Sequence, residues 1–276
     1  MTRIVIRRII EAVPVLLVIV TMTFFMIRLA PGGPFDDEKA VSPEVRERLE
    51  AYYKMDAPLI VQYFDYLWGL VRGDLGPSFK NASYTVNELI AIYFPVSMEL
   101  GAYAISVALV IGLIAGVSAA LRPNSARDYV PMSMAMIGIC VPNFVLGPIL
   151  VLIFGLWLDW LPVSGWDQPQ DKILPALTMG AMYAAFIARL SRGGMLEILS
   201  NDFIRTARAK GLSETRVLLR HALRGGLTPV VSYLGPAVAG LVSGSFVIET
   251  IFQIPGLGRH FVESAFNRDY TMIMGT

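Results

Sequence analysis

Long apolar runs separated by short polar stretches dominate the sequence. A helix needs roughly 20 apolar residues to cross the hydrocarbon core of a bilayer. Five runs meet or approach this length, at 12–27, 100–121, 130–158, 173–190 and 229–248. The third run contains Pro142 and Pro148, which predict a tilted or kinked helix. A sixth run begins near Thr271, and the six residues from there to Thr276 cannot cross a bilayer at about 1.5 Å each.

Composition supports a membrane location. The chain is 55% hydrophobic and 16% charged, whereas soluble domains carry about 25% charged residues. Its formal net charge of +1 provides no global field for nucleic acid. The sequence therefore predicts an all-α integral membrane protein with five complete spans and the start of a sixth.

Lys and Arg in the short loops orient these spans, because cytoplasmic loops carry an excess of both. One side holds thirteen of them: Arg3, Arg7, Arg8, Arg122, Arg127, Arg189, Arg192, Arg205, Arg208, Lys210, Arg216, Arg220 and Arg224. The other side holds three: Lys172, Arg259 and Arg268. The N-terminus is therefore predicted to be cytoplasmic.

This orientation divides the chain into three parts. Residues 1–30 form an N-terminal arm and the first span, 31–96 form an external helical segment, and 97–276 form a core with a cytoplasmic loop at 191–228. Within the external segment, Ser42, Pro43 and Glu44 predict a helix start. The stretch "PLIVQYFDYLWGLV" that follows is rich in Tyr and Trp. It predicts a helix that lies along the membrane interface or packs against the outer ends of the spans.

Small and acidic residues stand out within the apolar runs. Gly112 and Gly116, and again Gly240 and Gly244, make small-xxx-small patterns that favour close helix packing. The acids Glu11, Glu99 and Glu249 lie near span ends, where water and headgroups are expected to solvate them.

The chain shows no sign of catalytic or metal chemistry. It has one cysteine, Cys140, and its histidines, His221 and His260, are expected on different sides of the membrane, so no metal site is predicted. No nucleophile, base and orienting group occur at recognisable spacing, and no G-x-x-x-x-G-K-[ST] phosphate loop occurs. We therefore expect no enzyme activity, and any ATP that drives this protein is hydrolysed by another chain.

A basic stretch, "DFIRTARAKGLSETRVLLRHALR", interrupts the apolar sequence at 202–224 with six Lys or Arg against two acids. Asp202 to Lys210 predicts a short helix that ends at Gly211, and Ser213 is predicted to cap a second helix. A basic loop that sets topology and touches anionic lipid explains the charge alone. Two capped helices joined at a glycine favour a structured projection that binds a protein partner.

The same stretch resembles the EAA loop of ATP-binding-cassette importer permeases, in the form used by their peptide and nickel branch. It keeps Ala207, Gly211 and Leu223 of the general pattern. It departs from that pattern at four positions: Arg205, Thr206, His221 and Arg224. Four further segments look like the B-type membrane subunit of bacterial oligopeptide permeases: "RLAPGGPFD", "GDLGPSFK", "FPVSMELG" and "VIETIFQIPGLGRHFVESAFNRDY". The resemblance covers essentially the whole chain.

This resemblance implies a type I importer permease bundle in the bacterial inner membrane that moves oligopeptides. It implies a second homologous permease, two ATPase subunits and an extracytoplasmic solute-binding protein as partners, and places ATP and Mg in the ATPases. By resemblance, the ATPase contact is Arg205, Thr206, Ala207, Arg208, Ala209, Lys210, Gly211, Leu212 and Ser213. The external loop that faces the binding protein is Gly256, Leu257, Gly258 and Arg259.

Other functions remain open at this point. Dipeptide, glutathione and nickel importers share the same loop pattern. An ion-coupled secondary transporter would need internal repeats or broken helices around a midplane site. A membrane scaffold would use the basic loop to recruit a cytoplasmic protein without moving any solute.

Overall fold

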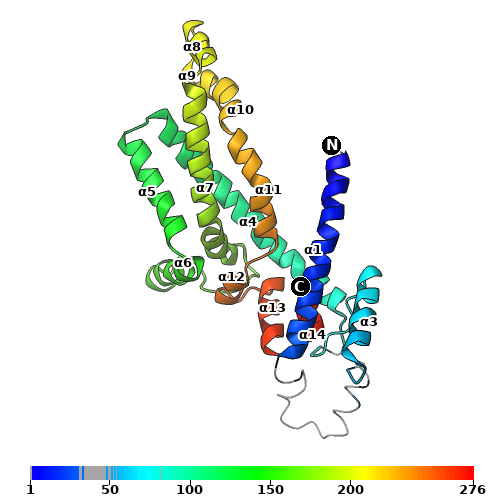
Figure 1. Cartoon of the computed structure of the whole chain (residues 1–276). Coiled ribbons are helices and arrows are strands. Elements are labelled where there is room, and N and C mark those ends of the chain that lie inside the picture. Colours follow the sequence, from blue (N-terminus) through cyan, green and yellow to red (C-terminus); the bar gives the residue numbers. More distant parts are fainter. Residues whose placement is uncertain are drawn as a thin grey trace. The chain divides into compact units, whose positions relative to one another are not determined.

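The computed structural model describes residues 2–30, 33, 48, 51, 53, 55–81 and 83–276. Within these residues the regular structure is helical, apart from an isolated antiparallel bridge between Pro77 and Thr85. The predicted helix start at Ser42, Pro43 and Glu44 lies outside the described residues. The chain forms two compact units, unit 1 with residues 1–93 and 260–276, and unit 2 with residues 94–259 (Figure 1).

Unit 1 contains α1 (Thr2–Leu29), α3 (Leu59–Val71), the first turns of α4 (Val86–Leu121), most of α13 (Leu257–Phe266) and α14 (Tyr270–Gly275). Only 6% of the most apolar part of α1 is buried within the chain. An apolar helix with so little protein around it is suited to a lipid environment. The predicted apolar helix after residue 57 is α3, and its residues are largely exposed too.

Aromatic and polar contacts hold unit 1 together. The buried Phe24 ring meets the Tyr63 ring edge-on, with centroids 5.3 Å apart, and the Arg28 guanidinium lies 3.7 Å from the Phe24 centroid. The Asp269 carboxylate begins α14 by accepting from the Met272 N–H at 3.2 Å, and it also accepts from the Ser78 hydroxyl. These contacts join segments that are distant in sequence.

Unit 2 is built around α7 (Ile173–Leu199), which lies among α4, α5 (Ala126–Cys140) and α11 (Thr228–Val242) (Figure 1). Glycines allow this close approach. A Cβ at Gly138 of α5 would lie 2.7 Å from the Ala181 carbonyl oxygen of α7. A Cβ at Gly180 of α7 would lie 2.7 Å from the Ala104 carbonyl oxygen of α4. Backbones that meet this closely gain dispersion and replace the hydrophobic driving force that lipid cannot provide.

Three described helical stretches are long and apolar enough to cross a membrane, Val5–Leu29, Val86–Leu121 and Pro169–Leu199. Two bent pairs raise this number to five. In the first pair, α5 meets α6 (Asn143–Leu150) and the π-helix η1 (Val151–Trp157) at 112°. Pro142 lies at the bend and has no N–H to continue the helical ladder. The predicted kink is confirmed.

The predicted fifth span at 229–248 is wrong at its C-terminal end. The helix α11 ends at Val242, and Gly244 follows with a φ of +80°. A short helix, α12 (Phe246–Ile251), then begins with the Ser245 hydroxyl accepting from the Ile248 N–H. Helix α11 itself is one half of the second bent pair. The other half is the preceding segment Glu214–Gly226, which lies at 53° to α11.

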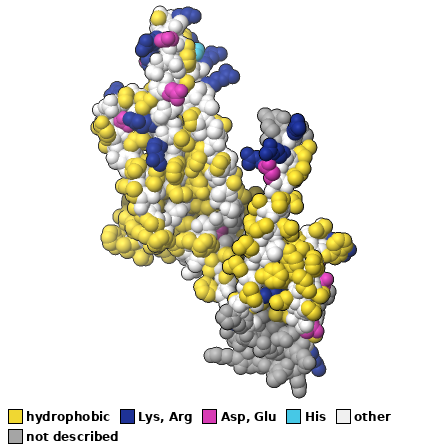
Figure 2. All heavy atoms as spheres, in the orientation of Figure 1, with side chains coloured by type: hydrophobic (Ala, Val, Ile, Leu, Met, Phe, Trp, Pro, Cys, Tyr) yellow, Lys and Arg dark blue, Asp and Glu magenta, His cyan; other side chains and the backbone are white. Residues whose placement is uncertain are grey.

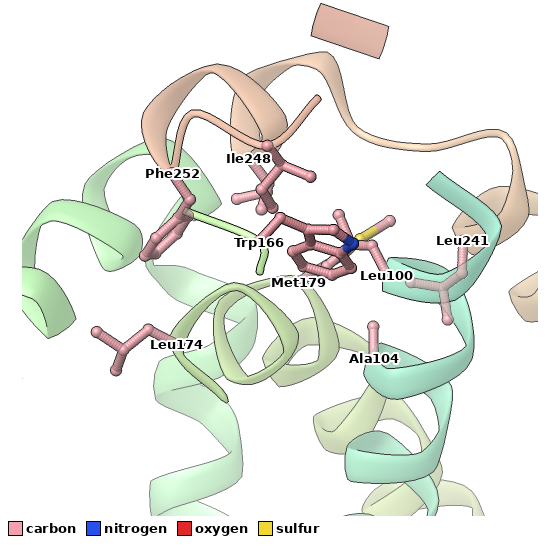
Figure 3. Packing of buried hydrophobic residues seen from close by; sticks show 9 residues of the cluster. Leu100, Ala104, Trp166, Leu174, Met179, Leu241, Ile248 and Phe252 are labelled. Atoms are coloured by element: carbon pink, nitrogen blue, oxygen red, sulfur yellow. The ribbon is translucent and has the colours of Figure 1, made fainter. Parts of the chain in front are cut away.

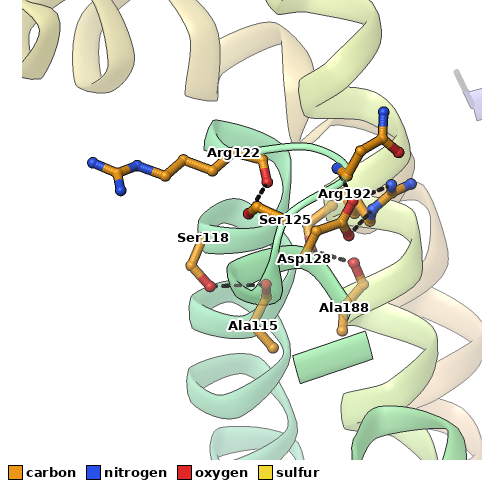
Figure 4. A network of polar contacts seen from close by, with 9 residues as sticks. Ala115, Ser118, Arg122, Ser125, Asp128, Ala188 and Arg192 are labelled. Atoms are coloured by element: carbon orange, nitrogen blue, oxygen red, sulfur yellow. Dashed lines mark hydrogen bonds and ion pairs between the residues drawn. The ribbon is translucent and has the colours of Figure 1, made fainter. Parts of the chain in front are cut away.

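Two clusters fix the elements of unit 2. An apolar cluster joins α4, α7, α11 and α12 around the buried Trp166, as Figure 3 shows. Figure 4 shows the polar contact between α5 and α7, in which the Arg192 guanidinium donates twice to the Asp128 carboxylate, at 2.6 Å each. Since Asp128 is only 2% exposed, this bidentate pair supplies the hydrogen bonds that its carboxylate needs.

Candidate functional site

The basic stretch folds as a helical projection at one end of unit 2 (Figure 1). It consists of α8 (Asp202–Ala209), α9 (Glu214–Arg216), the π-helix η3 (Val217–Ala222) and α10 (Leu223–Gly226). Gly211 follows α8 with a φ of +79°, and its N–H donates to the Arg208 carbonyl at 2.9 Å. The predicted glycine stop is confirmed, because this left-handed conformation ends a helix at low cost only for glycine.

Most of the predicted ATPase-contact residues are exposed on this projection. Figure 2 shows Lys and Arg side chains gathered over it. The exposed members are Arg205, Thr206, Arg208, Ala209, Lys210, Gly211 and Ser213. Ala207 is buried, with 6% exposure, and Leu212 is half-buried. The structure therefore leaves a basic surface available to a partner and turns Ala207 toward the inside.

The inward face of the projection anchors it to the bundle. Ile204 and Ala207 of α8 pack with Val217 of η3 against Met195 of α7 and Ala120 of α4. Ile204 and Met195 are fully buried. The apolar face thus joins the projection to two long helices of the bundle.

An ion pair closes the turn at Gly211. The Arg208 guanidinium donates to both oxygens of Glu214, at 2.8 and 3.1 Å. The prediction that Ser213 caps the second helix is wrong: Ser213 occupies the N-cap position of α9, but its side chain makes no capping hydrogen bond to any described residue. The pair with Glu214 raises the pKa of Arg208, because the nearby carboxylate favours the charged guanidinium.

A second turn, after α12, contains the residues predicted to form the external loop. Here α13 begins at Leu257, and the first N–H groups of a helix need acceptors from elsewhere. The Leu257 N–H donates to the Ser97 hydroxyl at 2.9 Å, and the Arg259 N–H donates to Glu249 Oε2 at 2.9 Å. The Ser97 hydroxyl in turn donates to Glu249 Oε1 at 2.8 Å. Side chains of α4 and α12 therefore cap α13.

Three glycines make room for the Glu249 carboxylate. A Cβ at Gly256 would lie 2.5 Å from Glu249 Oε2, and one at Gly258 would lie 3.0 Å from the same oxygen. A Cβ at Gly244 would lie 2.8 Å from Oε1. These glycines allow the backbone to enclose a carboxylate that is 0% exposed.

The expectation that Glu249 is solvated at a span end is wrong. Glu249 lies on α12, outside the candidate spans, and is fully buried. Burial raises the pKa of Glu249, while the N–H groups of Arg259 and Gly258 and the Ser97 hydroxyl oppose that shift by favouring the carboxylate. Glu99 instead pairs with Lys172 and accepts from the Trp166 indole, and Glu11 pairs with Arg7 on the surface.

The four glycines predicted to mediate helix packing have different surroundings. A Cβ at Gly112 of α4 would lie 2.7 Å from the Ala184 carbonyl oxygen, and Gly116 also lies directly against α7. A Cβ at Gly240 of α11 would lie 2.8 Å from the Tyr183 hydroxyl of α7. Gly244 belongs to the turn before α12. Three of the four positions thus face α7.

Ser97 and Glu249 were not predicted as site residues. The available signal was a carboxylate at the end of an apolar run, with Gly244 before it and a Pro-Gly-Leu-Gly stretch after it. Among the described residues, no group of three or more His, Cys, Asp or Glu side chains is arranged to hold a metal ion. In the turn after α12, Gly256 is buried and Leu257, Gly258 and Arg259 are half-buried, so the predicted external loop is less exposed than the basic projection.

Comparison with known proteins provides closely similar chains. The oligopeptide transport system permease protein OppB of Salmonella typhimurium is 50% identical over 99% of this chain and 90% of its own length. The dipeptide transport system permease protein DppB of Bacillus subtilis is 46% identical over 100% of this chain and 90% of its own length. An inward-facing structure of the MetNI methionine ABC transporter has a chain with the same kind of fold, with a TM-score of 0.55, 17% identity and coverage of 68% of this chain and 86% of that one.

Two family models together match nearly the whole sequence. The model of the N-terminal part of binding-protein-dependent transport system membrane components matches residues 1–101. The model of the binding-protein-dependent transport system inner membrane component matches residues 108–276, which include both turns. A permease subunit from this kind of transport system is also 50% identical over 99% of the chain. The chain belongs to the family of binding-protein-dependent transport system inner membrane components.

Proposed function

We propose that this chain is a transmembrane permease subunit of an ATP-driven importer of oligopeptides. The observation that carries this proposal is 50% identity, over 99% of the chain, to oligopeptide permease subunits of the B type. Dipeptides are the second candidate substrate, because a dipeptide permease subunit is 46% identical over the whole chain. Its place is the bacterial inner membrane, which it crosses several times.

The charge pattern supports an orientation with the N-terminus in the cytoplasm. The basic projection of α8, α9, η3 and α10 lies in the predicted cytoplasmic loop at 191–228, where positively charged residues are favoured. In this orientation the segment at 31–96 and the turn after α12 are external. The candidate spans are then α1, α4, the pair α5 with α6 and η1, α7, and α11, while the segment Glu214–Gly226 before α11 belongs to the cytoplasmic projection.

The projection is the proposed contact with an ATPase subunit. Its exposed residues from Arg205 to Ser213 offer basic and small side chains, while Ile204 and Ala207 join it to the bundle. Closure of two ATPases on ATP would move such a projection as a rigid body together with the helices behind it. The chemistry of ATP hydrolysis belongs to those partners, and this chain converts their movement into opening and closing of the path.

Two further partners complete the proposed transporter. A second homologous permease would line the path together with unit 2 of this chain. An extracytoplasmic solute-binding protein would deliver the peptide to the external turn at Gly256, Leu257, Gly258 and Arg259. A path with few charges suits peptides of varied sequence, because binding that is too strong would prevent release.

Reconstitution tests this function directly. Proteoliposomes would contain this chain, its partner permease and both ATPases, with ATP sealed inside and the binding protein with a labelled oligopeptide outside. We expect uptake that requires ATP, the binding protein and this chain together, with no ion gradient imposed. Uptake that follows an ion gradient and persists without ATP would instead support a secondary transporter. Partner binding without any flux would support a scaffold.

Gly211 provides the variant that tests the projection. Gly211→Pro should abolish uptake while the protein still inserts, because proline fixes φ near about −65° and removes the N–H that bonds to Arg208. Gly211→Asn is the matched control, because asparagine tolerates the left-handed conformation. Normal uptake by the proline variant would contradict the role of the projection.

A further inference from the structure

The hydrogen bonds of Ser97 and Glu249 point to a role beyond capping a helix. We infer that these two side chains are positioning residues of a buried relay, which transmits docking of the solute-binding protein at the external turn into α4. This inference rests on the proposed function, in which that turn faces the binding protein. The relay consists of the Leu257 N–H, the Ser97 hydroxyl, the Glu249 carboxylate and the Arg259 N–H.

The four members of the relay come from three different parts of unit 2. Ser97 belongs to α4, Glu249 to α12, and Leu257 and Arg259 to the turn that begins α13. Ser97 and Glu249 are both 0% exposed. Water therefore cannot replace a lost partner, so a shift of the turn must either move both side chains or leave buried polar groups unpaired.

The turn is also packed tightly against the side chains of Ser97 and Glu249. The Gly256 Cα lies so close to the carboxylate that an added Cβ would be 2.5 Å from Glu249 Oε2 and 2.7 Å from the Ser97 hydroxyl oxygen. Tightly packed groups of this kind change between discrete arrangements rather than deforming gradually. The turn and the start of the apolar part of α4 are thus obliged to move together.

Helix α4 can respond at this level. Pro95 lies inside α4, two residues before Ser97, and it removes one N–H from the helical ladder. Helices bend at such positions. A displacement delivered to Ser97 therefore acts next to a natural bending point.

From α4 the contacts continue to the basic projection. Gly112 and Gly116 of α4 lie against the α7 backbone, and α7 leads directly into α8 after Leu199. Ala120 at the end of α4 packs in the same cluster as Ile204 of α8. Unit 2 thus holds an unbroken series of packed contacts from the external turn to the proposed ATPase contact.

The experiment uses the complete reconstituted transporter and measures ATP hydrolysis with and without the peptide-loaded binding protein. The ratio of the two rates is the stimulation. We expect Ser97→Ala and Glu249→Gln to lower the stimulation by about fivefold or more, since coupling between sites typically amounts to roughly 5- to 150-fold. The maximal stimulated rate should fall, whereas the binding-protein concentration for half-maximal rate should change less.

Two matched variants serve as controls. Ser106→Ala removes a hydroxyl from the same helix, where it bonds only to the Ala102 carbonyl of its own turn at 2.7 Å among the described residues. Glu197→Gln removes an exposed carboxylate from α7. Both controls should keep the stimulation of the unmodified protein.

A cross-link separates failure of this inference from failure of the proposed docking site. Gln253 is exposed just before the turn, so Gln253→Cys should cross-link to a cysteine on the binding protein. Absence of cross-linking, with stimulation intact, would show that docking occurs elsewhere. Cross-linking in a Glu249→Gln background with unchanged stimulation would overturn the relay alone.

Thermal unfolding distinguishes a variant that has lost coupling from one that has lost its structure. A variant that lowers the melting temperature and lowers basal and stimulated rates by the same factor has lost structure, not coupling. That outcome for both Ser97→Ala and Glu249→Gln would overturn the relay. Loss of stimulation with a basal rate like that of the controls would support it.

Discussion

Two turns at opposite ends of unit 2 both contain glycine, but they require it for different physical reasons. The turn at Gly211 is exposed, and a Cβ there would meet no atom of the described residues within 4 Å. The turn after α12 encloses a carboxylate, and a Cβ at Gly256 would lie 2.5 Å from it. The first turn needs glycine for its backbone angle, whereas the second needs glycine for space.

The first turn is thus constrained by the conformation of one residue, and the second by its packing against neighbouring side chains. At Gly211 the side chains around the turn can vary as a partner requires, provided that the backbone keeps its left-handed residue. At Gly256 the backbone is packed against the side chains of Glu249 and Ser97, so none of these groups can change position alone. We therefore expect substitutions in the exposed turn to have local effects, and substitutions in the enclosed turn to displace α4 and α12 as well.

The largest expected effect compares alanine at the two glycines. Gly256→Ala should destabilise the protein by about 1–3 kcal/mol or more, because the new methyl group must displace the carboxylate or the turn. Gly211→Ala should cost about 1–2 kcal/mol, the price of a left-handed alanine, with no steric conflict. Melting temperatures of the two variants in detergent measure this order. A larger loss at Gly211 would remove the distinction between the turns.

The pH dependence of stability sharpens the comparison on the enclosed side. Because burial raises the pKa of Glu249, the folded protein binds this proton more tightly than the unfolded chain. The resulting stability is fully present below the ordinary value of 4.5 and is lost as pH rises through the raised pKa. Glu249→Gln cannot titrate, so its melting temperature should show a smaller decline over that range. Parallel curves for the two proteins would contradict this pKa direction.

The smallest effect is expected for the ion pair across the exposed turn. Arg208 and Glu214 are 43% and 71% exposed, and exposed pairs contribute about 0.2–1 kcal/mol. A double-mutant cycle with Arg208→Ala and Glu214→Ala should give a coupling in this range, and added salt should reduce it. A coupling well above it would show that the exposed turn is more rigid than its surroundings indicate.

Local signals in the sequence were enough for much of the fold. Long apolar runs indicated the long helices, Pro142 indicated the bend between α5 and α6, and Gly211 indicated the turn after α8. Each of these depends on residues that are neighbours in the chain. Propensity and hydrophobicity act at that range, so one sequence is sufficient to read them.

Contacts between distant residues were not predicted. Ser97 and Glu249 are 152 positions apart, and the Asp128 to Arg192 pair joins residues 64 positions apart. Before the helices are placed, Glu249 is simply an acid at the end of an apolar run, and solvation is the expected fate of such a group. Only the arrangement of α4, α12 and the turn shows that backbone N–H groups and a hydroxyl take the place of water.

The root of the basic projection has a mechanical consequence. Ile204 and Val217 are 0% and 1% exposed, and they are embedded with Met195 and Ala120 rather than suspended on a flexible tether. The projection is therefore rigidly attached to the bundle, because a close-packed interior has low compressibility. A force applied at its tip would be delivered to α4 and α7 with little lost in bending.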